Sequence, residues 1–299
     1  MIIGRLFLNH PLLSYQRDEH CFISRKESKN YSLLQKLSET LGISKCMRNN
    51  FYMSGEYIRK NPTLGIEDTS WKLTKIIPMV DEFIRDSSPK KATLLDAGGG
   101  AGLILKEVSN HLKRKGVTVT KYALDLSKEM LQRQKENNPD IKAMLNEDIS
   151  ETSISNKGID LTLMVDVLEH VTDTDKTLKE LNRISKYVIF KIPLENNVYY
   201  NTLDLIKRGR LRRDLIQQVG HINSYNFKAL KKKINTSGGE ILCYNFTNVF
   251  EYYLSAECQK QMVTGERTLY RIANLISTIS PGLCSCLFTD FVVCIVRYR

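Results

Sequence analysis

A short strand-like segment that leads into a cluster of glycines constrains this chain more than any other feature. Residues 93–97 read Thr-Leu-Leu-Asp-Ala, and four glycines fall among the next five positions. Such a run is too short for a helix and predicts a buried strand. Leu105, Val108 and Leu112 then recur along one face of a helix. A strand, a glycine turn and a helix together bring backbone N–H groups up to a ligand, and glycine permits its close approach.

The spacing of these glycines separates two classes of ligand. A dinucleotide site needs Gly-x-Gly-x-x-Gly, which would place its third glycine at position 103, where this chain has Leu. The order present is Asp96-x-Gly98-x-Gly100-x-Gly102. It resembles the first motif of the class I S-adenosylmethionine-dependent methyltransferases. The resemblance implies that the glycine backbone contacts the methionine and ribose parts of the cofactor and that Asp96 reaches the methionine amino group. A tight turn without a ligand remains the alternative at this point.

Two further acids follow later segments that are predicted to be strands. Residues 117–124 predict a second strand that ends at Asp125, where a carboxylate can accept hydrogen bonds from both ribose hydroxyls. An acid at this position binds the ribose of NAD equally well. Asp125 therefore favours a nucleotide ligand but does not distinguish NAD from S-adenosylmethionine. After a third strand over 142–145, the methyltransferase resemblance implies that Asp148 binds the adenine amino group and that Ile149 packs on the ring. Asp148 as the cap of a turn is the alternative, and Leu126 completes this part of the expected site.

The fourth predicted strand is the second strong signal. Residues 159–165 form an apolar run typical of a central parallel strand that is buried on both faces. The segment 166–171 reads Asp-Val-Leu-Glu-His-Val and resembles the methyltransferase subfamily of the ubiquinone-pathway O-methyltransferases and of many sugar and natural-product methyltransferases. Together with the earlier acids, the resemblance implies S-adenosyl-L-methionine as the cofactor and adds Asp166 to its site.

The implied fold is α/β, a Rossmann-like, seven-stranded, doubly wound sheet with helices on both faces. Further strands are expected over 186–192, 239–246 and 290–297, and family analogy places the last one antiparallel between the fifth and sixth.

We expect residues 1–67 to form an N-terminal extension or lid and residues 68–299 to form the methyltransferase domain. Insertions at 194–220 and 247–289 would build a helical cap over the substrate. Pro78 predicts a kink in a helix over 68–85, Ser224 is expected to cap a later helix, and Tyr57 and residues 70–72 are candidates for the site wall. For Trp71 a place in the core is the alternative.

Histidines at the expected rim are the candidates for proton transfer. A methyl group leaves a sulfonium by in-line displacement, so alignment and removal of the acceptor proton matter most. His170 and His221 lie in motifs near the pocket and could act as the base, or could serve only to orient and cap loops. Asp166, Glu169, His170 and His221 also resemble the metal site of the small-RNA 3′-end methyltransferases. A metal-assisted, RNA-end ribose 2′-O-methyltransferase is therefore an alternative.

The composition indicates which classes of binding partner this chain could have, but it does not identify one of them. The formal net charge is +11, and residues 207–213 carry five basic side chains, which form a solvated face or a clamp for an anion, an anionic lipid or nucleic acid. Seven scattered cysteines with no Cys-x-x-Cys pair, and no convincing signal peptide, favour reduced thiols in the cytoplasm. Asp290 interrupts the apolar tail 272–296, which is therefore expected to be a helix and a strand rather than a membrane span.

The expected function is transfer of a methyl group to a hydroxyl of a small molecule, sugar, lipid or quinone. A cofactor-binding protein without transferase activity and an NAD enzyme remain alternatives from other classes. Leu103 argues against NAD, and the intact acids argue against an inactive site.

Overall fold

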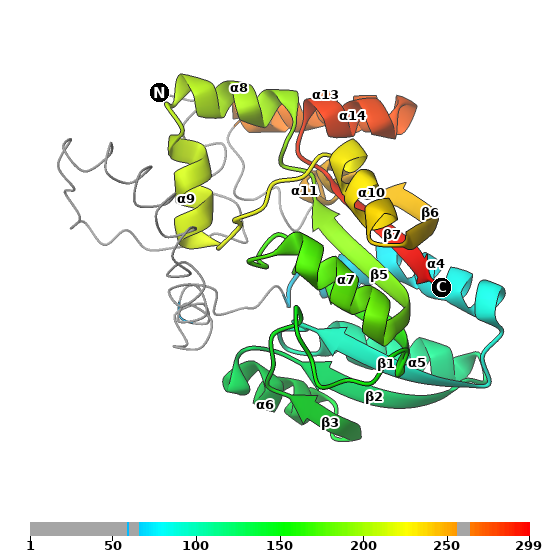
Figure 1. The fold of residues 1–299 in the computed structure, drawn as a ribbon. Coiled ribbons are helices and arrows are strands. Elements are labelled where there is room, and N and C mark those ends of the chain that lie inside the picture. Colours follow the sequence, from blue (N-terminus) through cyan, green and yellow to red (C-terminus); the bar gives the residue numbers. More distant parts are fainter. Residues whose placement is uncertain (1–58, 60–65, 256–263) are drawn as a thin grey trace, which may run out of the picture.

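The chain folds around one seven-stranded sheet (Figure 1). The structure is a computed structural model that describes residue 59, residues 66–255 and residues 264–299. The strands are β1 (Lys91–Ala97), β2 (Thr118–Leu124), β3 (Ile141–Leu145), β4 (Ile159–Val165), β5 (Ser185–Pro193), β6 (Gly239–Phe246) and β7 (Phe291–Tyr298). Their order is β3-β2-β1-β4-β5-β7-β6, and β7 is antiparallel to both of its neighbours. The predicted fold class and the predicted place of the last strand are therefore confirmed.

Helices cover both faces of the sheet, so its central strands are buried on two sides. The helices α7 (Thr174–Ile184) and α10 (Phe227–Thr236) lie in front of the sheet in Figure 1, and α4 (Thr69–Ser87) and α5 (Leu103–Arg114) lie behind it. The helix α6 (Lys128–Asn137) packs beside β2 and β3. Along β5, Val188 and Phe190 join the core on the α7 side, whereas Ile189 joins the core on the α4 side. This alternation follows from the two-residue period of a strand.

Capping residues decide where several helices begin. Ser127 caps α6, because its side-chain oxygen accepts from the N–H of Met130 at 3.3 Å. The prediction of Ser224 as the cap of α10 is wrong, because Asn226 accepts from the N–H of Ala229 and the helix begins at Phe227. Pro78 lies inside α4, which runs continuously from Thr69 to Ser87. A proline is tolerated there only at the loss of one backbone hydrogen bond.

The two predicted insertions are mainly helical and lie together near the end of β5. The first contains α8 (Val198–Ile206) and α9 (Arg210–Gln218), and the second contains α11 (Val249–Tyr253), α13 (Thr264–Ile279) and α14 (Pro281–Leu287). Figure 1 shows α8, α13 and α14 side by side along one edge of the molecule. Among the described residues, no helix is both long and apolar enough to cross a membrane.

Some predictions concern residues outside the described part of the chain. The lid over residues 1–67, apart from its last positions, and the side chain of Tyr57 belong to this group. Trp71 is described, and its ring stacks on Tyr252 at 5.0 Å and meets Phe291 edge-on at 6.2 Å. It belongs to a small apolar cluster between α4 and the second insertion, which matches the core alternative.

Candidate active site

The glycine loop between β1 and α5 has backbone angles that favour glycine. Gly98, Gly100 and Gly102 all have positive φ, at 69°, 54° and 74°. A Cβ at Gly98 would lie 2.8 Å from a methyl group of Val167 in the loop after β4. The loop therefore requires glycine for two reasons: its backbone angles disfavour other residues, and another loop packs against it.

Gly99 is under a tighter constraint, which the spacing of the motif did not reveal. A Cβ at this position would lie 2.0 Å from Oδ2 of Asp96, which is inside any allowed contact distance. The Asp96 side chain thus lies directly beneath the loop. It is 1% exposed, and its Oδ2 has no hydrogen-bond partner among the described residues. Burial, helped by the nearby charge of Asp125, raises the pKa of Asp96 to about 7.

The acids after β2 and β3 hold the loops that carry them. Oδ1 of Asp125 accepts from the N–H of Ser127 at 2.8 Å, and Oδ1 of Asp148 accepts from the N–H of Ser150 at 2.9 Å. The contact of Asp148 with Ser150 therefore agrees with the alternative in which Asp148 caps a turn. Burial raises the pKa of Asp125 to about 6, although the N–H groups of the loop oppose it.

One cavity of about 420 Å³ collects nearly all the expected site residues. Those that line it are Asp96, Gly98, Gly100, Asp125, Leu126, Asp148, Ile149, Asp166, His170 and His221. Gly102 is the exception, because a Cβ at this position would face Gln134 of α6 and Asn138 directly after that helix. Its role is to let α5 begin close to α6. Both insertions contribute to the wall, with Tyr199 and Leu215 from the first and Phe250 and Tyr270 from the second.

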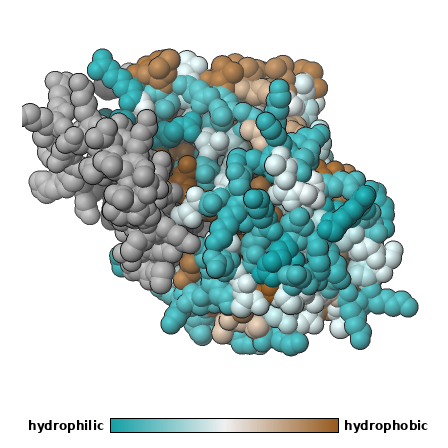
Figure 2. Space-filling view, viewed as in Figure 1, coloured by the Kyte–Doolittle hydropathy of each residue, from teal (hydrophilic) through white to brown (hydrophobic). Residues whose placement is uncertain are grey.

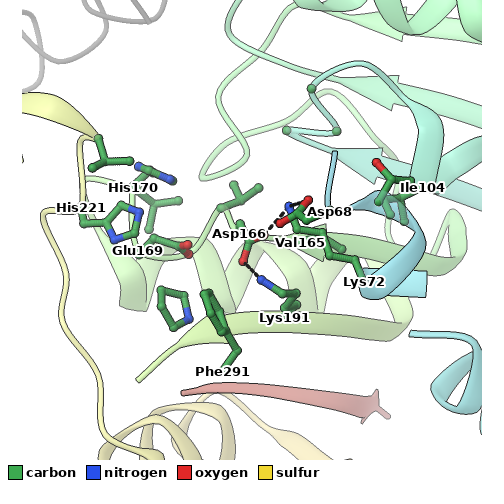
Figure 3. A pocket seen from close by; sticks show the side chains of 18 of the residues that line it. Asp68, Lys72, Ile104, Val165, Asp166, Glu169, His170, Lys191, His221 and Phe291 are labelled. Carbon is green, nitrogen blue, oxygen red and sulfur yellow. Dashed lines mark hydrogen bonds and ion pairs between the residues drawn. The ribbon is translucent and has the colours of Figure 1, made fainter. Parts of the chain in front are cut away.

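Asp166 lies at the centre of a buried cluster of charges (Figure 3). Its carboxylate is 2.5 Å from Nζ of Lys191 on β5 and 3.1 Å from Nζ of Lys72 on α4. Lys72 also pairs with Asp68 at 2.9 Å. Burial alone would raise the pKa of Asp166, but the two lysine charges outweigh it and hold that pKa well below its usual range. The ammonium of Lys191 also lies 3.6 Å from the ring centre of Phe291.

A second polar group stands on the other side of the same cavity (Figure 3). The rings of His170 and His221 meet edge to face, 4.7 Å apart, next to the carboxylate of Glu169. Nδ1 of His221 is 2.7 Å from Oε1 of Glu195, and Nδ1 of His170 is 3.1 Å from the carbonyl oxygen of Gly220. These contacts orient the Nε2 side of each ring, as a hydrogen bond at one ring nitrogen does for the other.

The two histidines have opposite acid–base character. Burial would lower the pKa of His221, but the charge and hydrogen bond of Glu195 raise it to about 9. Burial and the neighbouring charge of His221 lower the pKa of His170 to about 3. Burial raises the pKa of Glu169 to about 8 against the opposing effect of His221, and neither of its oxygens has a hydrogen-bond partner within the described chain. The site therefore offers one basic imidazole and one that stays neutral.

Several residues of the site escaped the sequence interpretation. Lys191 interrupts the apolar run of β5 and is 1% exposed. A charged residue within an otherwise apolar strand segment is a sequence signal from which Lys191 could have been identified as a site residue. Glu195 follows the same strand at the edge where Asp166 and Glu169 follow β4. Lys72 was expected only as a wall residue. Its partnership with Asp166 depends on the packing of α4 against β5 and β7.

Comparisons with known proteins agree with this geometry. Residues 95–187, from β1 to the start of β5, match the family model described as a methyltransferase domain. No curated protein is significantly similar in sequence to this chain.

Solved structures share the fold at low sequence identity. One is the geranyl diphosphate C-methyltransferase of Streptomyces coelicolor, solved with Mg²⁺, geranyl diphosphate and S-adenosyl-L-homocysteine; it is 11% identical over 73% of this chain and 77% of its own, with a TM-score of 0.50. A putative sarcosine dimethylglycine methyltransferase of Galdieria sulphuraria is 13% identical over 75% of this chain and 85% of its own, also at 0.50.

The sheet order, the glycine loop beneath which Asp96 is buried, and the matched family model lead to one conclusion. The chain carries a class I methyltransferase domain, the kind that takes its methyl group from S-adenosyl-L-methionine.

Proposed function

We propose that this domain methylates a hydroxyl oxygen on a small molecule, sugar, lipid or quinone, as the resemblance of residues 166–171 to the ubiquinone-pathway subfamily implies. The observation that supports this most is the His221–Glu195 pair at the cavity wall. A hydroxyl acceptor must lose its proton as the new bond forms, and a carboxylate-oriented imidazole is suited to take it. When bound, S-adenosyl-L-methionine supplies the electrophilic methyl group.

The cofactor would lie between the glycine loop and the loops after β2 and β3. We assign the methionine ammonium to Asp96, because its buried Oδ2 lacks a partner beneath the loop. The ribose hydroxyls go to Asp125, and the adenine goes to Asp148 with Leu126 and Ile149 as apolar walls. Asp166 was expected to join this set. Because two lysines engage its carboxylate, we assign it the role of fixing Lys72 and Lys191 at the cavity floor.

In the reaction that we propose, His221 accepts the proton of the acceptor hydroxyl at Nε2 while Nδ1–H donates to Glu195. His170 would remain neutral and orient the rim of the cavity through Gly220. The aromatic side chains Tyr199, Phe250, Tyr270 and Phe288 would exclude water from the acceptor side. Residues 194–220 and 247–289 would thus form the substrate cap, and residues 1–67 would form an N-terminal extension or lid.

Labelled methyl transfer to a panel of acceptors tests this function. Purified protein is incubated with methyl-labelled S-adenosyl-L-methionine and separate pools of phenols, quinols, sugars and hydroxylated lipids, and with carbon and nitrogen nucleophiles as competing arms. We expect label on oxygen in one hydroxyl pool. Label confined to a carbon or nitrogen acceptor would contradict O-methylation while leaving the methyltransferase domain intact.

Cofactor affinity should depend on pH in a defined direction. Asp96 has a pKa of about 7, and its carboxylate form is needed to bind an ammonium group. Below pH 7 binding must expel a proton, so the affinity for S-adenosyl-L-homocysteine should rise roughly tenfold per pH unit and level off above that pKa. Calorimetry across this range measures the slope. In Asp96→Asn the slope should flatten, and an unchanged slope in that variant would assign the linked proton to another group.

A metal-assisted reaction is a second candidate, which one observation favours. Glu169, His170 and His221 each offer one ligand atom, and these atoms lie within 4.8 Å of one another. Glu195 and the carbonyl of Gly220 orient the two imidazoles, as outer partners do at metal sites. The residues present therefore fit a divalent cation, which would supply a Lewis acid at the acceptor oxygen. Asp166, expected as a fourth ligand, is engaged by lysines instead.

Metal binding can be read without the reaction. If the cation site exists, Mn²⁺ or Zn²⁺ should raise the melting temperature of wild-type protein by several degrees, because an ion at about 100 times its Kd stabilises the folded protein by about 2.7 kcal/mol. Glu169→Gln should abolish that shift, while Glu251→Gln, at an exposed position on α11, should keep it. Turnover that is insensitive to chelators, together with the absence of a thermal shift, would exclude the metal-assisted reaction and favour the metal-free one. Weak, salt-insensitive RNA binding would remove the RNA-end variant.

A further inference from the structure

The helices that cover the cavity carry an exposed apolar surface on their outer side. We call this the roof surface. It consists of Val198, Leu205 and Ile206 on α8, Ile272, Leu275 and Ile279 on α13, and Leu283 on α14. Leu205 is 79% exposed, Ile279 76% and Ile206 70%, so these are side chains that face outward rather than partly packed ones. Contiguous apolar patches of this kind mark interaction sites, whereas single exposed apolar residues do not.

The sequence of the second insertion keeps charge away from this surface. Ile272, Leu275 and Ile279 recur at the spacing of one helical face, and the next exposed apolar residue is Leu283. No charged residue occurs from position 272 to position 289. Ser277, on another face of α13, is buried, and Asn274 is half-buried. The outer face of α13 is thus less polar than a face exposed only to water would be.

The two insertions meet where α8 begins and α14 ends, so the exposed apolar side chains of both lie along one edge of the molecule. Nδ2 of Asn197, which caps α8, donates to Oγ1 of Thr289 just after α14 at 2.8 Å. The rings of Tyr199 and Phe288 lie 5.6 Å apart at the same junction. Figure 2 shows the apolar atoms gathered along the edge of the molecule where α8, α13 and α14 lie in Figure 1.

Basic side chains border the roof surface after the end of α8 and on α13. Arg208 and Arg210 follow α8 directly and are exposed, with Lys207 beside them. Arg271, also exposed, comes one residue before the apolar stripe of α13. Apolar helix faces with adjoining basic residues are the arrangement that binds an anionic lipid surface, in which apolar side chains enter the acyl boundary and cations meet the headgroups.

We propose that the roof surface docks this protein on a membrane containing anionic lipids. The charge favours a bilayer over a second copy of the chain, because a symmetric pair would bring the same basic residues of two molecules together. The net charge of +11 adds a long-range attraction to the same partner. Docking would set the outer faces of α8, α13 and α14 against lipid, while Tyr199 of α8, Tyr270 of α13 and Phe288, directly after α14, line the cavity. This inference does not depend on the identity of the methyl acceptor.

Vesicle flotation with the full chain tests the proposal. The probes are vesicles of phosphatidylcholine alone and of equal parts phosphatidylcholine and phosphatidylglycerol. We expect binding to the anionic vesicles only, reduced severalfold when NaCl is raised from about 0.05 M to about 0.5 M, since salt shortens the range of charge attraction. Absence of binding to the anionic vesicles at low salt would overturn the proposal.

Matched variants separate the apolar and basic parts. Leu205→Gln combined with Leu275→Gln should lower binding about tenfold or more, because both side chains are exposed and their loss leaves the core intact. Met144→Gln, an exposed apolar position on β3, should leave binding unchanged. Arg208→Gln with Arg210→Gln should lower binding about tenfold, and Lys231→Gln with Lys232→Gln on α10 should not.

Two outcomes would assign the roof surface to another occupant. A protein that is dimeric in sedimentation, becomes monomeric in the Leu205→Gln, Leu275→Gln variant and binds no vesicle would show a contact between copies. Equal losses from the roof variants and from their matched controls would show general charge or hydrophobicity instead of a docking face. Either result would refute membrane docking.

Discussion

Replacing Asp125 with Ala is expected to lower the affinity for S-adenosyl-L-homocysteine by about 100-fold or more. Hydrogen bonds to a charged group contribute about 1.5–3 kcal/mol each, and the carboxylate can accept one from each ribose hydroxyl. Losing both would exceed the roughly 2.8 kcal/mol that corresponds to a factor of 100. Calorimetric titration measures the affinity directly, and the thermal shift caused by the ligand should disappear at the same time.

Two companion variants keep this result interpretable. Oδ1 of Asp125 also holds the N–H of Ser127, so the alanine variant loses a loop contact as well. Asp125→Asn retains an acceptor for Ser127 and removes only the charge, and we expect a loss of about tenfold in affinity. Asp175→Ala removes an exposed acid on α7 that pairs with Lys233 and should bind normally. Wild-type affinity in Asp125→Ala would refute our placement of the ribose.

Replacing His221 with Gln is expected to lower turnover by about 10²–10⁴-fold, the usual contribution of a positioned general base. Binding of S-adenosyl-L-homocysteine should be unchanged, because the glycine loop, Asp96 and Asp125 are untouched. His111→Gln provides the control, since His111 is also paired with a carboxylate, Asp81, but lies on α5 outside the cavity wall. Equal turnover in the two variants would exclude His221 as the base.

The pH profile of turnover distinguishes a base from a residue that only supports the loop. His221 must be neutral to accept a proton, and its pKa is about 9, so wild-type turnover should rise with pH up to that value. Glu195→Gln removes the charge that raises the pKa, so the inflection should move toward the ordinary histidine value, by about one to two pH units. A profile that does not move in Glu195→Gln would leave His221 with a structural role.

Local sequence patterns were sufficient to predict the main secondary-structure elements and the glycine turn of this protein. Apolar runs and helical periodicity located the strands and helices along the chain, and the resemblance to class I methyltransferases implied the doubly wound sheet. The order Asp96-x-Gly98-x-Gly100-x-Gly102 predicted a glycine turn, and the structure gives all three glycines positive φ. These features are readable because each depends on neighbours in sequence. A strand end, a helix face and a glycine turn express backbone geometry over fewer than a dozen residues. The wrong cap at Ser224 shows the limit, since Asn226 competed for the same helix start two residues later.

Partnerships across the sheet could not be read in the same way. Asp166 was expected to face the cofactor because it ends β4, yet its carboxylate pairs with Lys72 of α4 and Lys191 of β5. These two lysines are 119 positions apart, and only the packing of α4 over the sheet brings both to one carboxylate. Nothing in the neighbouring residues of either lysine encodes that meeting.

The sequence by itself determined where the strands lie along the chain, the glycine loop and the acids at the ends of β1, β2 and β3, because short segments specify backbone shape and end at a common edge of the sheet. The tertiary structure alone decided which side chains are charged and which are free to bind. Burial raised the pKa of Asp96 beneath Gly99, Glu195 raised that of His221, and the lysines lowered that of Asp166. Such shifts depend on desolvation and on charges a few ångströms away, and these distances exist only after distant segments have packed together.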